Sequence, residues 1–433
     1  MSGHLLVRLE KYLMADAVGQ AVVASIQAIP EPGLEAQAQR SREVILPSGT
    51  SPPLRVDLQP GRYLVEATLP SGDIASDEVE IFEAEDTSLN LHSDQSPHEW
   101  LSWQQLVGTV KQLGTYNLPT YLDFGFDPHP GLRTVAYWVA NPVPAMDGVM
   151  STQGEAWTHL ASVIGGGGGN VASQLSHTSP EPVTVPSMSD PISDLLEFTG
   201  EGPKHVWESP LPWQGQSPLP RRYLIVESET VTHLICMPVP WYSYSDGLDV
   251  PAQVLVKRQT GRERPELSVT VRDPLIGSAL GYMAVGALPT AALLYDTALS
   301  ILFDKVTNPL AAAGGGYVLL GTEHKGEEKV WHSWIENLMN WFEWLPDGAI
   351  QHGWLKVRHR QSTSDLDEAR QAFFTAYNRG LPFYSVGLQW LADGLAIFAS
   401  SDPEAARMLD DVTRVARQTN MQSPFTIVRL PIL

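Results

Sequence analysis

Cysteine and basic residues are scarce in this sequence. Its 433 residues include one cysteine, Cys236, which excludes an intramolecular disulfide and any zinc or iron–sulfur site built from several cysteines. Lys and Arg number 28 against 49 Asp and Glu, so the formal net charge is −21 at pH 7. Binding to duplex nucleic acid or to anionic lipid needs clustered positive charge, and we expect neither. The composition is typical of the reducing cytosol, and we predict a cytoplasmic location.

Motifs of common reactions are also lacking. The glycine run 165–169 is not followed by the lysine of a phosphate-binding loop, and no H-E-x-x-H or G-x-S-x-G is present. Cys236 lies in an apolar run, where a cysteine is usually a small buried hydrophobe rather than a nucleophile. Asp123, Asp127 and His129 lie close together without further ligand spacing, which favours a turn-rich loop over a cation site. We therefore predict no catalytic residue, no cofactor and no metal ligand.

Long apolar runs are rare as well. The one segment that raises a membrane question, Pro274–Tyr295, has 22 residues without a formal charge. Pro289 lies in its second half, acids flank it at Asp273 and Asp296, and alanine and glycine replace the Leu, Ile, Val and Phe of typical spans. Because proline interrupts a helix interior, we predict two short buried helices rather than a transmembrane segment.

The N-terminal part has the pattern of a small β-sandwich. Over residues 1–83, apolar β-branched runs alternate with turns rich in Gly and Pro. The first 100 residues carry 16 acids and 6 bases, a net charge of −10, and the acids are densest in Glu78–Asp86. Such a run favours a solvated sheet edge that resists aggregation; the alternative is an acidic docking face for a basic partner. A polar linker is predicted at 84–98.

Residues 99–272 are predicted to form a mixed α/β middle domain. It begins with an amphipathic helix at Trp100–Leu113 and ends with four apolar strands between 222 and 271. Between them, 165–219 is rich in Gly, Pro and Ser and is predicted to be a long loop. A loop of this length in a compact domain is usually functional or disordered.

An internal repeat dominates the C-terminal part. Four prolines recur at intervals of 35, 37 and 36 residues, at Pro274, Pro309, Pro346 and Pro382. Each is followed by an aromatic residue, in the series Tyr282, Tyr317, Trp354 and Trp390. A period near 34–37 with two helices per unit is typical of tetratricopeptide solenoids. We predict four helical-hairpin repeats over 273–420 and hence a multidomain α+β protein: β-sandwich, β-rich middle domain and tetratricopeptide-like repeats.

Local signals place the ends of several of these helices. Ser364 is predicted as an N-cap, Gly380 lies just past the same helix, and Asp402-Pro403 opens the last one. The apolar tail, 421–433, is expected to add a strand to another domain or to dock in a groove. Aromatic stripes at helical spacing are more often core, but a set of tryptophans is also the candidate interaction face: Trp331, Trp334, Trp341, Trp344, Trp354 and Trp390.

The repeat region resembles a known group of bacterial proteins. The similarity covers roughly 270–400 and rests on the segments DPLIGSALGYMAVG, NPLAAAGGGYVLLG, WIENLMNWFEWLPDGAIQHGW and RGLPFYSVGLQWLADGL. These segments are similar to caspase- and tetratricopeptide-associated proteins encoded beside caspase-like and CHAT peptidases in anti-phage systems, some linked to type III CRISPR loci. The resemblance implies an adaptor, inhibitor or substrate of the peptidase. It brings no catalytic motif that matches positions in this chain.

The favoured hypothesis is therefore a non-enzymatic interaction protein whose partner is a caspase-like or CHAT peptidase or a regulated effector. A peptidase needs an extended, unpaired segment, so the predicted loop at 165–219 is a candidate cleavage region, with Arg221 and Arg222 at its end. Two alternatives remain: an enzyme with a site in the middle domain near Cys236, and a membrane-acting effector released by cleavage.

Overall fold

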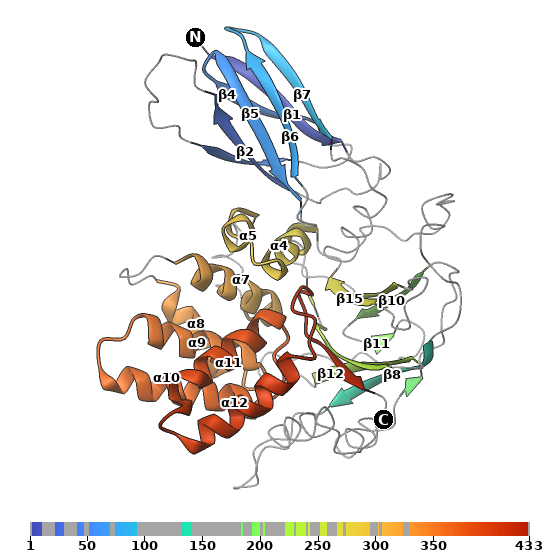
Figure 1. Cartoon of the computed structure of the whole chain (residues 1–433), viewed down its shortest axis with the longest axis vertical. Helices are drawn as coiled ribbons and strands as arrows, with labels where there is room; N and C mark the ends of the chain where they lie inside the picture. Colours follow the sequence, from blue (N-terminus) through green and yellow to red (C-terminus); the bar gives the residue numbers. More distant parts are fainter. Residues whose placement is uncertain are drawn as a thin grey trace. The chain divides into compact units, whose positions relative to one another are not determined.

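The computed structural model divides the chain into two compact units (Figure 1). One contains Met1–Asn117 and Arg272–Asp296, and the other contains Leu118–Val271 and Thr297–Leu433. The structure describes residues 2–10, 22–29, 41–46, 52–69, 74–92, 132–140, 183–184, 193–199, 202–203, 221–228, 231–239, 241–242, 252–257, 266–271, 274–294, 302, 305–323 and 330–431.

The first unit is β-rich. A three-stranded sheet has the order β4-β1-β7 and a four-stranded sheet the order β3-β2-β5-β6. Pairing is antiparallel except between β1 and β7, which run parallel. The strands are β1 (Gly3–Glu10), β2 (Val22–Ala28), β3 (Arg42–Leu46), β4 (Leu54–Leu58), β5 (Gly61–Thr68), β6 (Ile74–Ile81) and β7 (Asp86–His92).

Alternating side chains of these strands form one hydrophobic core. Leu5, Val7 and Leu9 of β1 are buried in this core, and each of the strands β2 to β7 also contributes buried residues to it. The linker predicted at 84–98 is wrong over 86–92, where the chain forms β7. Leu89 and Leu91 are buried there and alternate with exposed residues, the period of a strand with one face on a core.

Two short helices complete the first unit, α4 (Pro274–Ala284) and α5 (Leu288–Leu294). Gly286 allows the turn between them because its φ is +80°, a conformation that glycine adopts without a Cβ clash. The structure thus assigns this pair to the β-rich unit, whereas the sequence placed it in a 273–420 repeat domain. Within the unit, α5 packs near β2, and the Tyr282 hydroxyl donates a hydrogen bond to the Thr68 carbonyl.

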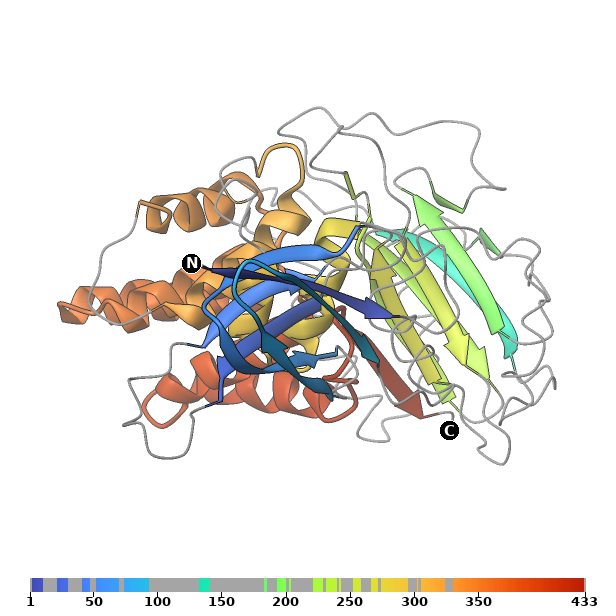
Figure 2. The same cartoon turned by 90° about the horizontal axis from the view of Figure 1, so that it is seen from above.

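The second unit contains two antiparallel sheets. One has five strands in the order β16-β13-β12-β8-β9, and the other four in the order β11-β10-β14-β15. The strands are β8 (Leu132–Ala140), β9 (Val183–Thr184), β10 (Ser193–Thr199), β11 (Gly202–Pro203), β12 (Arg221–Ser228), β13 (Val231–Met237), β14 (Ala252–Lys257), β15 (Glu266–Val271) and β16 (Ile427–Pro431). Figure 2 shows β8 in teal, the strands from β9 to β15 in green to yellow, and β16 in red.

The long loop predicted at 165–219 is interrupted by strands. Ser193–Thr199 forms β10 and pairs with β14 along its length. Apolar Leu195, Leu196 and Phe198 within this stretch favour a strand over a loop, despite the surrounding Gly, Pro and Ser. The candidate cleavage residues Arg221 and Arg222 also lie in a strand: they begin β12, where Arg222 is opposite Met237 of β13 and Val139 of β8.

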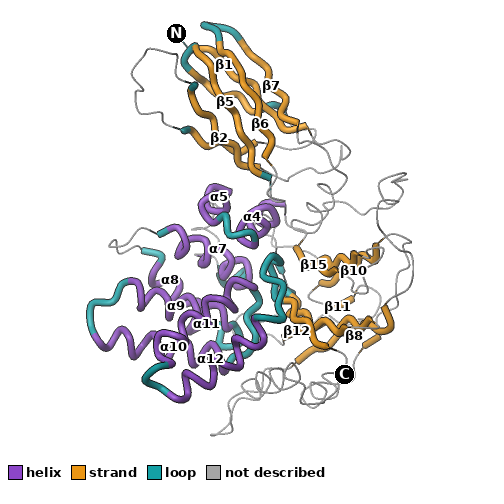
Figure 3. Tube along the Cα trace, in the orientation of Figure 1, coloured by secondary structure: helices purple, strands orange, loops and turns teal. Residues whose placement is uncertain are grey.

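The described helices of the second unit include six between residues 309 and 416 (Figure 3). They are α7 (Pro309–Thr322), α8 (His332–Trp341), α9 (Pro346–Arg358), α10 (Thr363–Asn378), α11 (Ser385–Ala399) and α12 (Pro403–Ala416). Pro309, Pro346 and Pro403 each occupy the first turn, where the missing N–H costs no helical hydrogen bond. The predicted cap of α10 is displaced: Ser362, not Ser364, accepts from Asp365 N–H, and Asp365 completes a capping box.

The apolar tail adds a strand to a sheet of its own unit. β16 pairs with β13 from Ile427 opposite Ile235 to Pro431 opposite Val231. Ile427 and Val428 are buried, which explains why the tail is apolar. The tail thus forms a strand, as the first of the two expectations had it, but the sheet belongs to the same unit and not to another domain.

Several expectations lie outside the described residues: the helix at Trp100–Leu113, the glycine run 165–169, and the turn with Asp123, Asp127 and His129. Among the described helices, none has the length and apolar character needed to cross a bilayer; Pro274–Tyr295, for example, is divided between α4 and α5.

Candidate functional site

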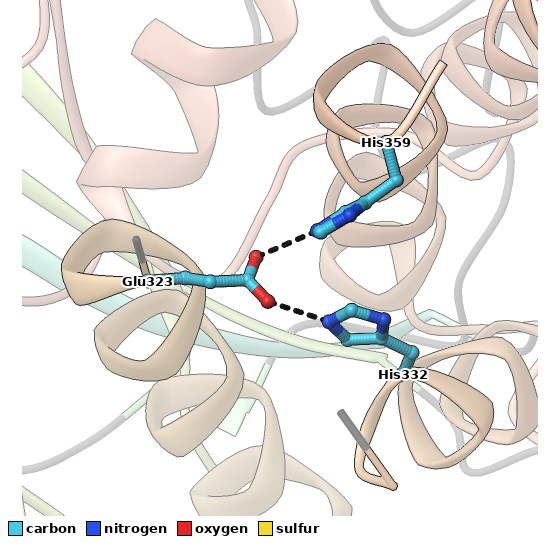
Figure 4. Close-up of side chains that lie close together, drawn as sticks. All are labelled: Glu323, His332 and His359. Carbon is cyan, nitrogen blue, oxygen red and sulfur yellow. Dashed lines mark hydrogen bonds and ion pairs between the residues drawn. The ribbon is translucent and has the colours of Figure 1, made fainter. Parts of the chain in front are cut away.

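Three ionisable side chains meet where three helices of the second unit begin or end. Glu323 follows the last residue of α7, His332 is the first residue of α8, and His359 follows the last residue of α9. Figure 4 shows the carboxylate pointing between the two imidazole rings. Helix ends bring together residues that are 9 and 36 positions apart in the chain.

The carboxylate bridges the two rings. Nε2 of His332 lies 2.6 Å from Oε1 of Glu323, and Nε2 of His359 lies 3.0 Å from Oε2. The two ring centroids are 4.5 Å apart. Each of the three residues offers one potential metal-ligand atom, and these three atoms all lie within 4.8 Å of one another. Both histidines therefore present the same nitrogen to the same carboxylate.

Burial increases along the cluster from His359 to Glu323. The Glu323 side chain is 3% exposed, against 12% for His332 and 22% for His359. A carboxylate loses solvation when it is buried, and this loss is offset only by close donors or cations. The imidazoles are the donors here, and the partial exposure of His359 leaves the cluster in contact with solvent.

Neighbouring side chains hold the three residues in place. The buried Trp331 ring meets the His332 ring edge-on, with 4.5 Å between centroids. Arg358 donates to the Leu320 carbonyl of α7 and lies over the Trp390 ring, so the end of α9 is attached to the last turn of α7. Burial lowers the pKa of Arg358, and the nearby charge of Glu323 acts in the opposite direction. The pair is therefore electrostatically coupled.

Two imidazole nitrogens and one carboxylate are a ligand set that proteins use for Zn²⁺ and other divalent transition metals. Without an ion, the same groups form a hydrogen-bonded His–Glu–His triad. Within the described residues, this is the one group of three or more His, Cys, Asp or Glu side chains placed to hold a metal ion.

Sequence reasoning missed this cluster because no short motif connects its members. The signal is positional and belongs to the structure: each residue lies at or next to a helix end that the sequence analysis did not locate. Using it would have required knowing that the ends of α7 and α9 and the start of α8 face one another, which is a property of helix packing.

The sequence-predicted residues are distributed differently. Cys236 is fully buried in β13, opposite Tyr223 of β12, as expected of a small hydrophobe. Of the candidate interaction face, Trp331 and Trp344 are buried, and Trp354 packs edge-on against Trp390 and donates its indole N–H to the Trp390 carbonyl. Trp334 is half-buried, and Trp341 is 53% exposed. The six tryptophans therefore do not form one exposed face.

A protein-family model matches part of this chain. The family model described as the Y4kD C-terminal domain matches residues 278–427, about a third of the chain. The matched segment contains Glu323, His332 and His359 and ends at the first residue of β16. No curated protein and no solved structure matches this chain.

Proposed function

We propose that this chain is a non-enzymatic interaction protein whose helical region binds a protein partner. The observation that carries the proposal is the succession of helix pairs in the second unit, α7–α8, α9–α10 and α11–α12, at the spacing of the sequence repeat. Contacts between α9 and α10 and between α11 and α12 support tetratricopeptide-like units. Stacked helix pairs present extended surfaces, and such surfaces bind peptides or helices.

For the first unit we propose an accessory β-sandwich. Two observations support this: its two sheets share one core, and β6 exposes the acidic residues Asp77, Glu78 and Glu80. We propose that this unit is a module attached to the interacting region. Its exposed acidic residues also support the alternative that this unit binds a basic partner.

The proposed partner is a caspase-like or CHAT peptidase of a bacterial anti-phage system, or an effector regulated with it. This choice rests on the resemblance of the repeat segments. The role we propose is that of adaptor or regulator rather than substrate cut at Arg221 or Arg222. Both residues begin a strand paired on two sides, and a peptidase cleft would require β12 to leave β8 and β13 first.

The proposed contact surface is the exposed part of α8. Trp341 is 53% exposed, with Lys305 Nζ 4.8 Å from its ring centroid, and Val330, two residues before α8, is 77% exposed. Exposed tryptophan is enriched among residues that dominate binding energy at interfaces. Trp331 and Trp344, which are buried, would serve the fold instead.

The test uses the purified full chain and any caspase-like or CHAT peptidase encoded next to its gene. Light scattering after size exclusion measures complex formation, and intact mass measures cleavage. Trp341→Ala should weaken binding about 30-fold, the equivalent of the ~2 kcal/mol lost at a hot-spot tryptophan. Ile397→Ala is the control, because Ile397 is an exposed apolar residue of α11 at 42% exposure.

A stable complex without cleavage supports the adaptor or regulator role. A cut chain supports the substrate role instead. The interaction proposal fails if the two proteins neither associate nor react, and the assignment to α8 fails if both variants bind as the unaltered chain does.

A further inference from the structure

We propose that Glu323, His332 and His359 form a binding site for a divalent transition-metal ion, with Zn²⁺ as the ion of choice for the test. The proposal stands apart from the interaction proposal, because it depends only on the geometry of the cluster. Its three residues come from three helices and converge with ligand atoms within 4.8 Å of one another.

The donor set determines the class of ion. Imidazole nitrogen is a ligand for Zn, Cu, Fe and Ni, whereas Mg²⁺ and Ca²⁺ prefer all-oxygen sites. The sole cysteine is buried in β13, so thiolate does not contribute to the site. Three protein ligands from His and Glu leave one tetrahedral position open, as in catalytic rather than structural zinc sites.

The present geometry is close to that of a bound ion. With bonds of ~2.0–2.2 Å, tetrahedral ligand atoms lie about 3.4 Å apart. The observed separations from carboxylate oxygen to imidazole nitrogen are 2.6 and 3.0 Å. These two separations would have to widen by about 0.8 and 0.4 Å to reach that value.

A bound ion would replace the two hydrogen bonds of the triad. In the triad each Nε2 faces a carboxylate oxygen, whereas a metal ion is bound by an imidazole nitrogen that carries no proton. The ion then takes over the role of the two N–H donors, which neutralise only part of the charge on a carboxylate that is 3% exposed.

The surroundings restrict the motion of the ligands. The Trp331 ring packs on the His332 ring. Arg358, the residue before His359, donates a hydrogen bond to the Leu320 carbonyl. Ligands held by neighbouring groups lose less conformational freedom on binding. A bound ion would connect the end of α7, the start of α8 and the end of α9 at one point.

The experiment measures Zn²⁺ bound by the full chain. The protein is stripped with a chelator, dialysed against ZnCl₂ and analysed for metal content, and affinity is measured by competition with a chromophoric chelator. We expect the unaltered chain to hold one more equivalent of zinc than a double variant that carries both His332→Asn and His359→Asn. Glu323→Gln should weaken binding by more than about 100-fold, since loss of an outer partner alone costs roughly 10- to 100-fold.

His4→Asn is the matched control. His4 Nδ1 lies 2.6 Å from Asp57 Oδ1 in the first unit, a histidine–carboxylate pair with one imidazole and greater exposure, 25% and 70%. Zinc binding should be unchanged in this variant. The proposal is overturned if the unaltered chain and the double variant bind equal amounts of zinc, or if His4→Asn reduces binding as much as the cluster variants do.

A second measurement does not depend on the folding of any variant. Zinc X-ray absorption of the loaded, unaltered chain reports the atoms bound to the ion. Two imidazoles with additional oxygen at ~2.0–2.2 Å support the site. A spectrum with any other number of imidazoles, or a chain that retains no zinc after dialysis, overturns it.

Discussion

The Asp347 carboxylate is fully buried in the first turn of α9 and accepts three hydrogen bonds. The donors are the Tyr317 hydroxyl at 2.9 Å, the Phe383 N–H at 2.9 Å and the Tyr384 N–H at 3.3 Å. Burial, and then the charge of Asp347, raise the pKa of Tyr317 well above its ordinary value. At the residue scale, this carboxylate joins α7, α9 and the segment before α11.

Replacing Asp347 should destabilise the protein strongly. Asp347→Ala leaves three buried donors without their acceptor, and we expect a loss of about 3–5 kcal/mol in the free energy of unfolding. Urea denaturation followed by circular dichroism measures it. Asp393→Ala is the control: that carboxylate, on α11, is exposed and bonded to Gln389, so its loss should change stability by less than about 0.5 kcal/mol. Equal effects of the two substitutions would contradict this interpretation.

His352 should make stability depend on pH below neutrality. Burial, followed by the charge of Lys356, lowers its pKa from 6.5, and Glu336 and Glu368 oppose the shift only partly. Well above pH 6.5, His352 is neutral in both the folded and the unfolded chain. As the pH falls below 6.5, the unfolded chain binds a proton that the folded chain does not, so stability falls until the folded pKa is reached.

The contribution of His352 has an upper limit of about 1.4 kcal/mol per pH unit, the slope for one proton. Unfolding in urea at several pH values between 7 and 5, for the unaltered chain and for His352→Gln, isolates it. The variant should show a shallower loss of stability on acidification. A loss as steep as that of the unaltered chain would assign the pH dependence to other groups.

At the scale of elements, the helix starts are determined by caps and prolines. Asn308 accepts from the Ala311 N–H before α7, and Asp402 accepts from Glu404 and Ala405 before α12, each followed directly by a proline in the first turn. These signals are local, because the cap and the N–H groups it serves lie within three residues. Asp402-Pro403 located α12 in the sequence, whereas α7 was located by the place of Pro309 in the proline series.

The two serines near the start of α10 give a direct test of cap position. Ser362→Ala removes the side chain that accepts from Asp365 N–H, and we expect a loss of about 1 kcal/mol. Ser364→Ala should be neutral or slightly stabilising, because Ser364 lies inside the first turn and alanine has the higher helix propensity. Thermal unfolding compares the two variants. The reverse order would restore Ser364, the residue favoured by the sequence, as the cap.

At the scale of the whole molecule, both units are assembled from separate parts of the chain. In the second unit, the tail returns to the sheet after α12, and β16 pairs with β13. Thr426 N–H also donates to the Phe383 carbonyl at 2.9 Å, and Arg429 N–H donates to the Gln418 carbonyl at 2.8 Å. The tail therefore bonds to the sheet and to the segments that flank α11 and α12.

Deleting residues 427–433 should destabilise sheet and helices of the second unit together. Removal of buried Ile427 and Val428 alone is expected to cost at least about 3 kcal/mol. Hydrogen exchange should become faster in β13, α11 and α12 and stay unchanged in β1 and β5 of the first unit. Deleting only 432–433 is the control and should alter none of them. Unchanged exchange in α11 and α12 would show that the tail supports the sheet alone.

What the sequence by itself determined is the local structure: the helix starts at Pro309, Pro346 and Pro403, the β-rich N-terminal region and the four strands between 222 and 271. Periodicity, capping and turn chemistry act over a few residues, so one chain suffices to read them. Tertiary structure decided which elements became partners. Only packing gave β7 and β16 their neighbouring strands, placed α4 and α5 in the first unit, buried Trp331 and Trp344, and brought Glu323, His332 and His359 together. Contacts between distant segments leave no fixed spacing in the sequence, because they depend on how whole elements pack.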